Sequence, residues 1–283
     1  MHVPEASVLL PDPAQQQAGL AALLPGFGHL DWLAQTGSTN ADLLLRGRQG
    51  HAGNLPWLLG THLQQAGRGR AGRPWRNRAG AALMFSCGFE VQAPAARLPF
   101  LSFLAGMIAC ETLRRIAPAP ARHDIILKWP NDVQFGQAKL AGILVESMRM
   151  GTGFLVVMGI GINLADAAET SLHLGREVAD WSQILSTAPT PAPQDACMIV
   201  ASLAQAWQQA VAEFEHGTLG DVDARFAAID ALRGRAINVI DREHVLLSGT
   251  AAGIDHQGCL QVETEDGRIH PVSIGEISVR THS

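Results

Sequence analysis

Alternating and continuous apolar positions along the chain predict several short strands. Apolar runs at residues 57–64 and 83–89 indicate two strands with a loop rich in glycine and arginine between them. Further runs at 125–129, 140–147 and 154–162 indicate three more. The last two runs are separated only by the turn-prone segment MRMGTG, so we expect them to pair as antiparallel neighbours.

Two longer segments predict helices. Residues 98–116 form the longest apolar segment, broken by Ser102, Glu111 and two arginines, which suits a buried helix better than a membrane span. A second segment follows the proline-rich stretch TAPTPAPQD and repeats apolar residues at helical spacing. Its predicted buried face consists of Ile199, Leu203, Ala206, Trp207, Ala210 and Phe214.

The pattern also predicts how the chain divides into domains. Residues 1–34 are rich in proline, alanine and glutamine, and we interpret them as a short extension that adds a helix or an edge strand. After Arg233 the chain changes to short strands separated by glycine and aspartate turns, which predicts an all-β module of about 50 residues, interpreted as a barrel. The expected units are therefore residues 1–34, 35–233 and 234–283.

Composition narrows the class of protein. A chain of 283 residues with 47% hydrophobic residues can bury a substantial core, and its net charge of −5 gives no global reason to bind nucleic acid or an anionic membrane. The four cysteines form no C-x-x-C pair, so neither a zinc site nor a disulfide framework is indicated. The N-terminus lacks the basic region of a signal peptide. We therefore expect a cytoplasmic protein.

Residues 67–78, GRGRAGRPWRNR, form the most basic stretch of the chain. The glycines allow close approach of the main chain to a ligand, and the arginines offer planar forks for phosphate or carboxylate. The spacing is not that of a P-loop. A solvated basic loop and a nucleic-acid arm are the alternatives, but a loop between two strands of an acidic protein favours a small anionic ligand. We expect this loop to be mobile until the ligand binds. Its arginines are Arg68, Arg70, Arg73, Arg76 and Arg78.

Only two of the 21 Lys and Arg residues are lysines, and both lie in one short stretch. An ammonium group is a compact point charge that guanidinium cannot readily replace, so Lys128 and Lys139 are candidate site residues. Lys139 begins the apolar run KLAGILVE, and burial there calls for an anionic partner. For Lys128, a side chain that extends from the strand edge to solvent is an equal alternative.

Two further motifs carry polar groups that suit a ligand. GIGIN closes an apolar strand with Asn163, whose amide can donate and accept as a ribose or a base edge requires. Ser38, Thr39 and Asn40 precede the helical sequence ADLLLR, so capping is their default role. Their hydroxyl and amide groups would equally suit a polar ligand head.

The combination of motifs resembles biotin protein ligase in both order and spacing. It comprises STN at 38–40, QQAGRGRAGRPW at 64–75, KWPND at 128–132, KLAGILVE at 139–146 and GIGIN at 159–163. The likeness covers most of residues 36–280, including the terminal GEISVR. It implies an α+β fold, in which a catalytic domain related to class II aminoacyl-tRNA synthetases, with a mixed sheet and helices, precedes a small SH3-like β barrel.

The resemblance also implies an activity. Such ligases join biotin to ATP as biotinyl-5′-AMP with release of pyrophosphate, and then transfer biotin to a lysine of the biotin carboxyl carrier protein of acetyl-CoA carboxylase. The expected cofactors are ATP and Mg²⁺, the latter held mainly by ATP with unknown protein ligands. No nucleic acid or membrane partner is expected.

The resemblance assigns roles to individual residues. The catalytic residues would be Lys139, Arg70 and Asp132. The biotin site would comprise Ser38, Thr39, Asn40, Gln64, Arg68, Gly69, Arg70 and Lys139. The ATP or adenylate site would comprise Gly67, Arg73, Trp75, Lys128, Asn131, Asp132 and Asn163.

Two departures from the family pattern qualify these expectations. Only 37 residues precede Ser38, too few for a winged DNA-binding domain, so we predict a monofunctional ligase without repressor activity. The chain also lacks tyrosine, so that Met84 or Phe85 would have to supply the aromatic packing after the loop. The alternatives are a lipoate or other acyl-adenylating ligase of the same fold, and a non-catalytic arginine-loop binding protein. Exposed edge strands would allow a homodimer.

Overall fold

A mixed seven-stranded sheet forms the centre of the larger part of the protein. The computed structural model describes residues 7–50, 53–75, 78–241, 244–273 and 278–281. Arg76 and the Gly-Glu-Ile part of the terminal motif lie outside these described residues. The strands of the sheet are, in spatial order, β2 (His29–Leu33), β3 (Trp57–Thr61), β4 (Ala82–Val91), β8 (Gly153–Asn163), β7 (Ala138–Met150), β6 (Asp132–Phe135) and β5 (Ile125–Lys128).

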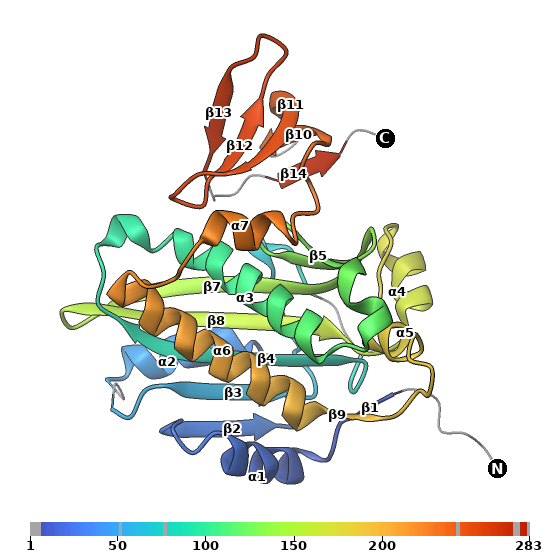
Figure 1. Cartoon of the computed structure of the whole chain (residues 1–283). Coiled ribbons are helices and arrows are strands. Elements are labelled where there is room, and N and C mark those ends of the chain that lie inside the picture. The colour runs from blue at the N-terminus through green and yellow to red at the C-terminus, as the bar shows by residue number, and fades with distance from the viewer. Residues whose placement is uncertain (1–6, 51–52, 76–77, 242–243, 274–277, 282–283) are drawn as a thin grey trace.

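Neighbouring strands of this sheet run antiparallel except for the parallel pair β2 and β3. The predicted pairing of β7 with β8 is confirmed: Met150 lies opposite Gly153, and Gly151 adopts a φ of 58° in the turn between them. Glycine suits this left-handed conformation because it has no Cβ. The long hairpin forms the middle of the sheet together with β4 (Figure 1).

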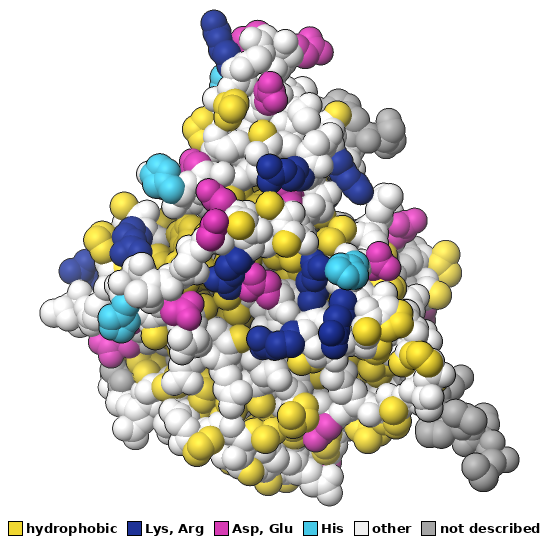
Figure 2. Space-filling view, in the orientation of Figure 1, with side chains coloured by type: hydrophobic (Ala, Val, Ile, Leu, Met, Phe, Trp, Pro, Cys, Tyr) yellow, Lys and Arg dark blue, Asp and Glu magenta, His cyan; other side chains and the backbone are white. Residues whose placement is uncertain are grey.

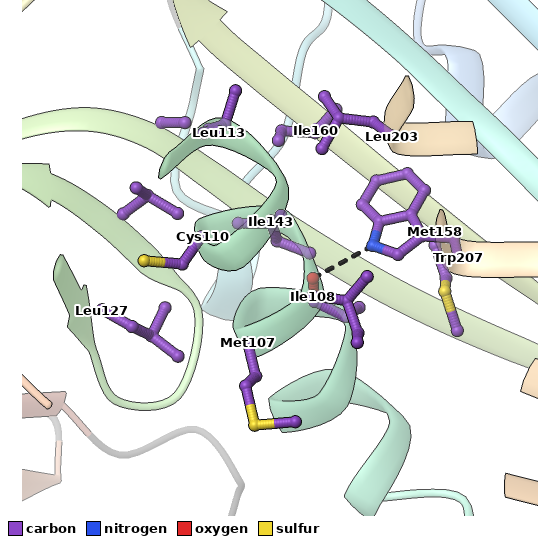
Figure 3. Close-up of a cluster of buried hydrophobic side chains, with 14 of the residues drawn as sticks. Met107, Ile108, Cys110, Leu113, Leu127, Ile143, Met158, Ile160, Leu203 and Trp207 are labelled. Carbon is purple, nitrogen blue, oxygen red and sulfur yellow. Dashed lines mark hydrogen bonds between the residues drawn. The ribbon is translucent and has the colours of Figure 1, made fainter. Parts of the chain in front are cut away.

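Three helices cover one face of the sheet: α1 (Pro13–Leu23), α3 (Phe100–Ile116) and α6 (Ala196–His216). Figure 1 shows α3 and α6 crossing this face side by side. Figure 3 shows apolar side chains of both helices meeting those of β5, β7 and β8, with the Trp207 indole donating to the carbonyl of Ala105 over 3.0 Å. The predicted helices at 98–116 and around Trp207 are therefore confirmed, and their apolar faces form the core.

The opposite face of the sheet is covered only in part. α2 (Thr39–Arg48) packs its leucines against Trp57, Leu155 and Val157. Side chains alternate along a strand, so the next residues of β8 on this face are Gly159 and Gly161. Beyond the start of α2, β8 therefore contributes a floor of two glycines to this face of the sheet.

The C-terminal residues form a separate five-stranded antiparallel sheet, in agreement with an SH3-like domain. Its spatial order is β13 (Ile269–Val272), β12 (Leu260–Glu263), β11 (His244–Ile254), β10 (Ala236–Asp241) and β14 (Ser278–Thr281). Irregularities between Val239 and Ile240 and between Ala251 and Ile254 allow its strands to bend. The Trp129 indole donates to the carbonyl of Gly258 over 2.9 Å, which ties this module to the larger sheet.

Connecting segments complete the fold. The extension at 1–34 supplies both the helix α1 and the edge strand β2, and the short strand β1 (Val8–Leu9) pairs with β9 (Gln194–Asp195). The strand predicted at 57–64 ends at Thr61. The remaining short helices are α4 (Ala167–Leu174), α5 (Trp181–Leu185) and α7 (Val222–Ala227). All four cysteines are free, as expected, and none of the described helices is long and apolar enough to cross a membrane.

Basic side chains gather over the middle of the helix-covered face (Figure 2). The last turn of α3 carries Arg114 and Arg115, and the segment after it carries Arg122. Arg114 donates to the carbonyl of Ala228 over 2.8 Å, and Arg122 donates to that of Ala117 over 3.0 Å. These two arginines thus bind backbone carbonyls.

Candidate active site

A cavity of about 520 Å³ lies over the glycine floor of the sheet. It is bounded by the start of α2, by the arginine loop and by the β5–β6 turn, and the C-terminal module contributes at its edge. The structure brings these predicted residues to its wall: Ser38, Thr39, Asn40, Gln64, Arg68, Gly69, Arg70, Arg73, Trp75, Lys128, Asn131, Asp132 and Lys139. Gly67 and Asn163 are not part of the wall.

The glycines of GIGIN are required by close packing at the floor. A Cβ at Gly159 would lie 2.1 Å from Oδ1 of Asn40, and a Cβ at Gly161 would lie 2.6 Å from the Trp75 indole. Both separations are far shorter than van der Waals contact. The two glycines therefore allow Asn40 and Trp75 to lie directly on the sheet.

One end of the cavity carries a hydrogen-bond network of hydroxyl and amide side chains. Gln64 Oε1 accepts from the backbone N–H of Thr39 over 2.9 Å, and the Thr39 hydroxyl lies 2.6 Å from that of Ser86. Ser86 also donates to Asn40 Oδ1 over 2.6 Å. Ser38 occupies the N-cap position of α2, but its side chain makes no capping hydrogen bond. The group of Gln64, Thr39, Ser86 and Asn40 is called the polar end below.

The arginine loop is a small hairpin that lies across the cavity. Gly69 donates its N–H to the carbonyl of Arg73 over 2.7 Å, and Trp75 donates to that of Gly67 over 2.8 Å. Ala71 has a φ of 52° at the tip, an uncommon conformation for a residue with a Cβ. Gly67 thus contributes backbone to the hairpin.

Two arginines of this hairpin reach the strands beneath it. Arg70 Nη1 donates to Asn131 Oδ1 over 3.1 Å, and burial lowers the pKa of Arg70 while the charge of Asp132 opposes that shift. Arg68 lies 3.9 Å from Glu146. The Arg70 guanidinium is therefore held partly desolvated and directed at the cavity, where an anion would be its strongest partner.

Lys139 and Asp132 form an ion pair at the centre of the cavity. Their Nζ and Oδ1 atoms are 2.6 Å apart, and the lysine side chain is 16% exposed. The Lys139 ammonium also lies 5.4 Å from the centroid of the Trp75 ring, within cation–π range. The prediction that burial of Lys139 requires an anionic partner is confirmed, with Asp132 as that partner.

The other end of the cavity is cationic. Burial lowers the pKa of Lys128, Asp132 opposes this shift, and the charges of Lys139, Arg280 and Arg176 add to it. Arg176 follows α4, and Arg280 belongs to β14 of the C-terminal module. This group of Lys128, Arg176 and Arg280, with Lys139 beside it, is called the cationic end. Asp132 is the only carboxylate among the described residues that line the cavity.

Some residues of the site were not found from the sequence. Ser86, Arg176 and Arg280 line the cavity, and Glu146 accepts from Asn40 Nδ2 over 2.9 Å behind the polar end. Ser86 lies in a strand that predicted only core packing. Glu146 and Arg280 fell inside motifs that carried the family resemblance, but nothing in their spacing assigned them a contact.

Two sequence expectations have a different structural outcome. Asn163 Nδ2 donates to the carbonyls of Lys139 and Ala179, both over 3.1 Å, so its amide joins β8 to neighbouring backbone. Phe85 packs against Trp207 on the helix-covered face, with ring centroids 5.9 Å apart. Phe85 therefore cannot supply aromatic packing in the cavity, and the fully buried Met84 is not part of the cavity wall. The alternation of side chains along β4 explains why Phe85 points away.

Comparison with known proteins agrees with this architecture. Residues 34–163 match the Biotin/lipoate A/B protein ligase family, and residues 233–280 match the Biotin protein ligase C terminal domain. The bifunctional ligase/repressor BirA of Salmonella typhimurium is 34% identical, over 99% of this chain and 83% of its own length. The biotin–[acetyl-CoA-carboxylase] ligase of Mycobacterium tuberculosis is 38% identical, over 57% of this chain and 61% of its own length.

The fold is also similar to solved structures. The biotin protein ligase of Aquifex aeolicus, solved in complex with biotin and ATP, superposes with a TM-score of 0.69 at 23% identity, over 90% of this chain and 100% of that chain. The chain belongs to the biotin protein ligase family, and it is a ligase enzyme.

Proposed function

We propose that the protein is an ATP-dependent ligase that activates biotin to biotinyl-5′-AMP with release of pyrophosphate. It then transfers the biotinyl group to a lysine of the biotin carboxyl carrier protein of acetyl-CoA carboxylase. The observation that carries this proposal is the division of one cavity into an end of hydroxyl and amide groups and a cationic end. Biotin has a polar ring and a carboxylate, and ATP has a triphosphate. Bound one after the other, the two substrates match this order of polar and cationic groups along the cavity.

The polar end supports biotin over lipoate as the acyl substrate. The ureido ring of biotin carries N–H donors and a carbonyl acceptor, whereas the dithiolane ring of lipoate carries neither. Thr39 and Asn40 are 3% and 4% exposed, and Gln64 lies beside them. An apolar ring would leave the Gln64 Nε2 hydrogens and the remaining lone pair of Thr39 Oγ1 unpaired, at a cost of about 1–3 kcal/mol for each group. The polar end therefore favours a ligand whose ring can form hydrogen bonds with these groups.

The cationic end suits the first chemical step. The biotin carboxylate attacks the α-phosphorus of ATP, a P–O bond forms, and the bond to pyrophosphate breaks. No nucleophilic side chain is needed, because positioning and charge stabilisation supply the rate enhancement. In this proposal Lys139 and Arg70, which line the cavity, stabilise the α-phosphoryl group, and Lys128, Arg176 and Arg280 bind the outer phosphates.

Mg²⁺ would accompany ATP and neutralise part of the triphosphate charge. No cluster of three or more metal-ligating side chains occurs among the described residues. With Asp132 the sole carboxylate on the described wall, the phosphate oxygens would supply most of the metal ligands.

The second step requires a deprotonated acceptor lysine. Its amine attacks the acyl carbon of the mixed anhydride, AMP leaves, and a proton is lost from nitrogen. Asp132 is our candidate for orienting that amine or accepting its proton, a role that requires its pairing with Lys139 to loosen. This role is separate from the contact of Asp132 with Lys139.

The product of the whole reaction provides the test. The enzyme is incubated with ATP, Mg²⁺ and a biotin carboxyl carrier domain, with either biotin or lipoate, and the carrier is analysed by mass spectrometry. We expect one biotinyl group on one carrier lysine and no lipoyl group. Lipoylation in preference to biotinylation would favour the alternative acyl-adenylating ligase, and no modification by either acid would favour a non-catalytic binding protein.

Repressor activity and assembly are independent of this reaction. We propose that the chain does not bind operator DNA, that it acts in the cytoplasm, and that its exposed edge strands permit a homodimer. A salt-sensitive mobility shift with duplex DNA would contradict the first point. Analytical ultracentrifugation with and without biotin and ATP tests the last.

A further inference from the structure

We propose that Ser86 is a positioning residue that makes Thr39 a hydrogen-bond acceptor toward the acyl substrate. This inference rests on the proposed function, because it requires a ligand whose head group presents an N–H to Thr39. Ser86 is fully buried in β4, beneath the polar end. Its hydroxyl is shared between Thr39 and Asn40, each at 2.6 Å.

The orientation of the Asn40 amide is fixed by its other neighbours. Asn40 Nδ2 donates to Glu146 Oε2 over 2.9 Å and to the carbonyl of Leu144 over 3.2 Å. Both acceptors lack a hydrogen to donate, so a flipped amide would place oxygen against oxygen. Asn40 Oδ1 must therefore face Ser86. Both amide hydrogens of Asn40 are used within the protein, which makes Asn40 a support of the network.

The direction of the Thr39 hydroxyl follows from a count of hydrogens. Asn40 Oδ1 can only accept, so the single hydroxyl hydrogen of Ser86 is donated to it. Ser86 Oγ must then accept in its contact with Thr39, and the Thr39 hydroxyl hydrogen is donated to Ser86. Thr39 Oγ1 keeps a lone pair and has no hydrogen left for Gln64 Oε1, 3.2 Å away.

Gln64 complements this arrangement. Its Oε1 accepts from the backbone N–H of Thr39, so its Nε2 hydrogens remain for a ligand. The polar end thus presents an acceptor at Thr39 and a donor at Gln64. Adjacent N–H and C=O groups of a cyclic urea match this pair. Without the Ser86 hydroxyl, the Thr39 hydrogen would no longer be held on Ser86. It could then turn toward the ligand N–H, where two hydrogens would face each other and Thr39 could not accept.

The direct test is Ser86→Ala, measured as the KM values for biotin and for ATP and as kcat in pyrophosphate exchange. We expect the KM for biotin to rise about tenfold, the equivalent of about 1.4 kcal/mol, with kcat and the KM for ATP within about twofold of the parent. Cys87→Ala is the matched control, because Cys87 is the next residue of β4, equally buried, and faces the helix-covered side. Equal effects in both variants, or a rise in the KM for ATP, would overturn the proposal.

A double-mutant cycle separates positioning from general damage. Thr39→Val removes the hydroxyl through which Ser86 acts, so adding Ser86→Ala to it should cause little further loss of biotin binding by calorimetry. Additive losses would contradict the proposal. Should Ser86→Ala fail to fold, Thr39→Ser provides the second comparison: it retains the hydroxyl, so biotin binding should stay close to the parent while Thr39→Val weakens it.

These outcomes also distinguish this proposal from the proposed function. If the parent enzyme binds no biotin, both fail. If the parent binds biotin and supports exchange but Ser86→Ala binds biotin equally well, only the role of Ser86 is refuted.

Discussion

Lys139 and Asp132 are joined by a 2.6 Å ion pair that spans the neighbouring strands β7 and β6. Both side chains are partly shielded from solvent, at 16% and 31% exposed, and the Lys139 ammonium lies against the Trp75 ring. Asp132 therefore holds the Lys139 ammonium in a defined place. Any bound anion must either share Lys139 with Asp132 or displace it.

Replacing Asp132 by Asn tests the two roles assigned to this carboxylate. We expect Asp132→Asn to reduce biotin-dependent pyrophosphate exchange by about tenfold to a hundredfold, because Lys139 loses the charged hydrogen bond that orients it. Single-turnover transfer from preformed biotinyl-5′-AMP to a carrier domain is measured in parallel. Transfer at the parental rate would refute a direct role of Asp132 in the second step and leave only its contact with Lys139.

Because Gly161 lies directly beneath Trp75, adding a side chain at this position should have a steric effect. A Cβ there would lie 2.6 Å from the Trp75 indole, so Gly161→Ala should displace Trp75 and raise the KM for ATP by about tenfold or more. Gly26→Ala is the matched control, since nothing lies within 4 Å of its Cβ position. Circular dichroism melting checks that both variants fold. Unchanged kinetics in Gly161→Ala would show that Trp75 need not lie on the floor for activity.

Replacing Lys128 by an uncharged residue should have opposite effects on stability and on activity. Burial lowers its pKa, so the unfolded chain, with an ordinary value of 10.5, binds the lysine proton more readily than the folded chain. The charge of Lys128 is thus unfavourable to folding below its lowered pKa, and this penalty disappears as the pH rises toward 10.5. Lys128→Met should raise the free energy of unfolding at pH 7 and raise the KM for ATP.

Denaturant unfolding at several pH values checks the Lys128 prediction. The gain in stability from Lys128→Met should shrink between neutral pH and pH 10, whereas the exposed Arg48 should give no such gain when changed to Met. A loss of stability at pH 7 in Lys128→Met would mean that packing of the lysine stem outweighs the burial of its charge.

The parts of the fold that follow local patterns could be predicted from the sequence. The hairpin of β7 and β8 has apolar strands and a short glycine turn, and α3 is apolar along nearly its whole length. The expected strand at 57–64 is too long because the polar residues after Thr61 pair with the segment before α2, as in the bridge between Thr36 and Gln64. Such pairing depends on tertiary contacts.

The structure of the N-terminal extension, residues 1–34, could not be predicted in detail from the sequence. α1 buries only Gln16 and Leu20, so its sequence lacks the regular apolar stripe that would indicate a helix. β2 is an edge strand of five residues with one buried side chain, Trp32. Neither element carries a local pattern strong enough to fix its place in the sheet.

Site residues that belong to local motifs could likewise be predicted from the sequence, whereas those brought together only by the fold could not. Motifs with unusual composition, such as the arginine loop and the lysine-bearing segments, identified most of the cavity wall. Ser86 was missed because its partner Asn40 lies 46 positions away and the contact depends on the order of strands in the sheet. Arg176 lies after a short helix with no recognisable motif, and only the folded chain brings it toward Lys128.

Biotin-dependent exchange of labelled pyrophosphate into ATP tests the central claim most directly. The parent enzyme is compared with Lys139→Ala and Arg70→Ala in the presence of Mg²⁺, with lipoate in place of biotin as the control acid. The proposed mechanism predicts exchange with biotin alone and a loss of about a hundredfold or more in each variant, as expected when a group that stabilises transition-state charge is removed. No exchange by the folded parent enzyme, or parental exchange in both variants, would contradict it.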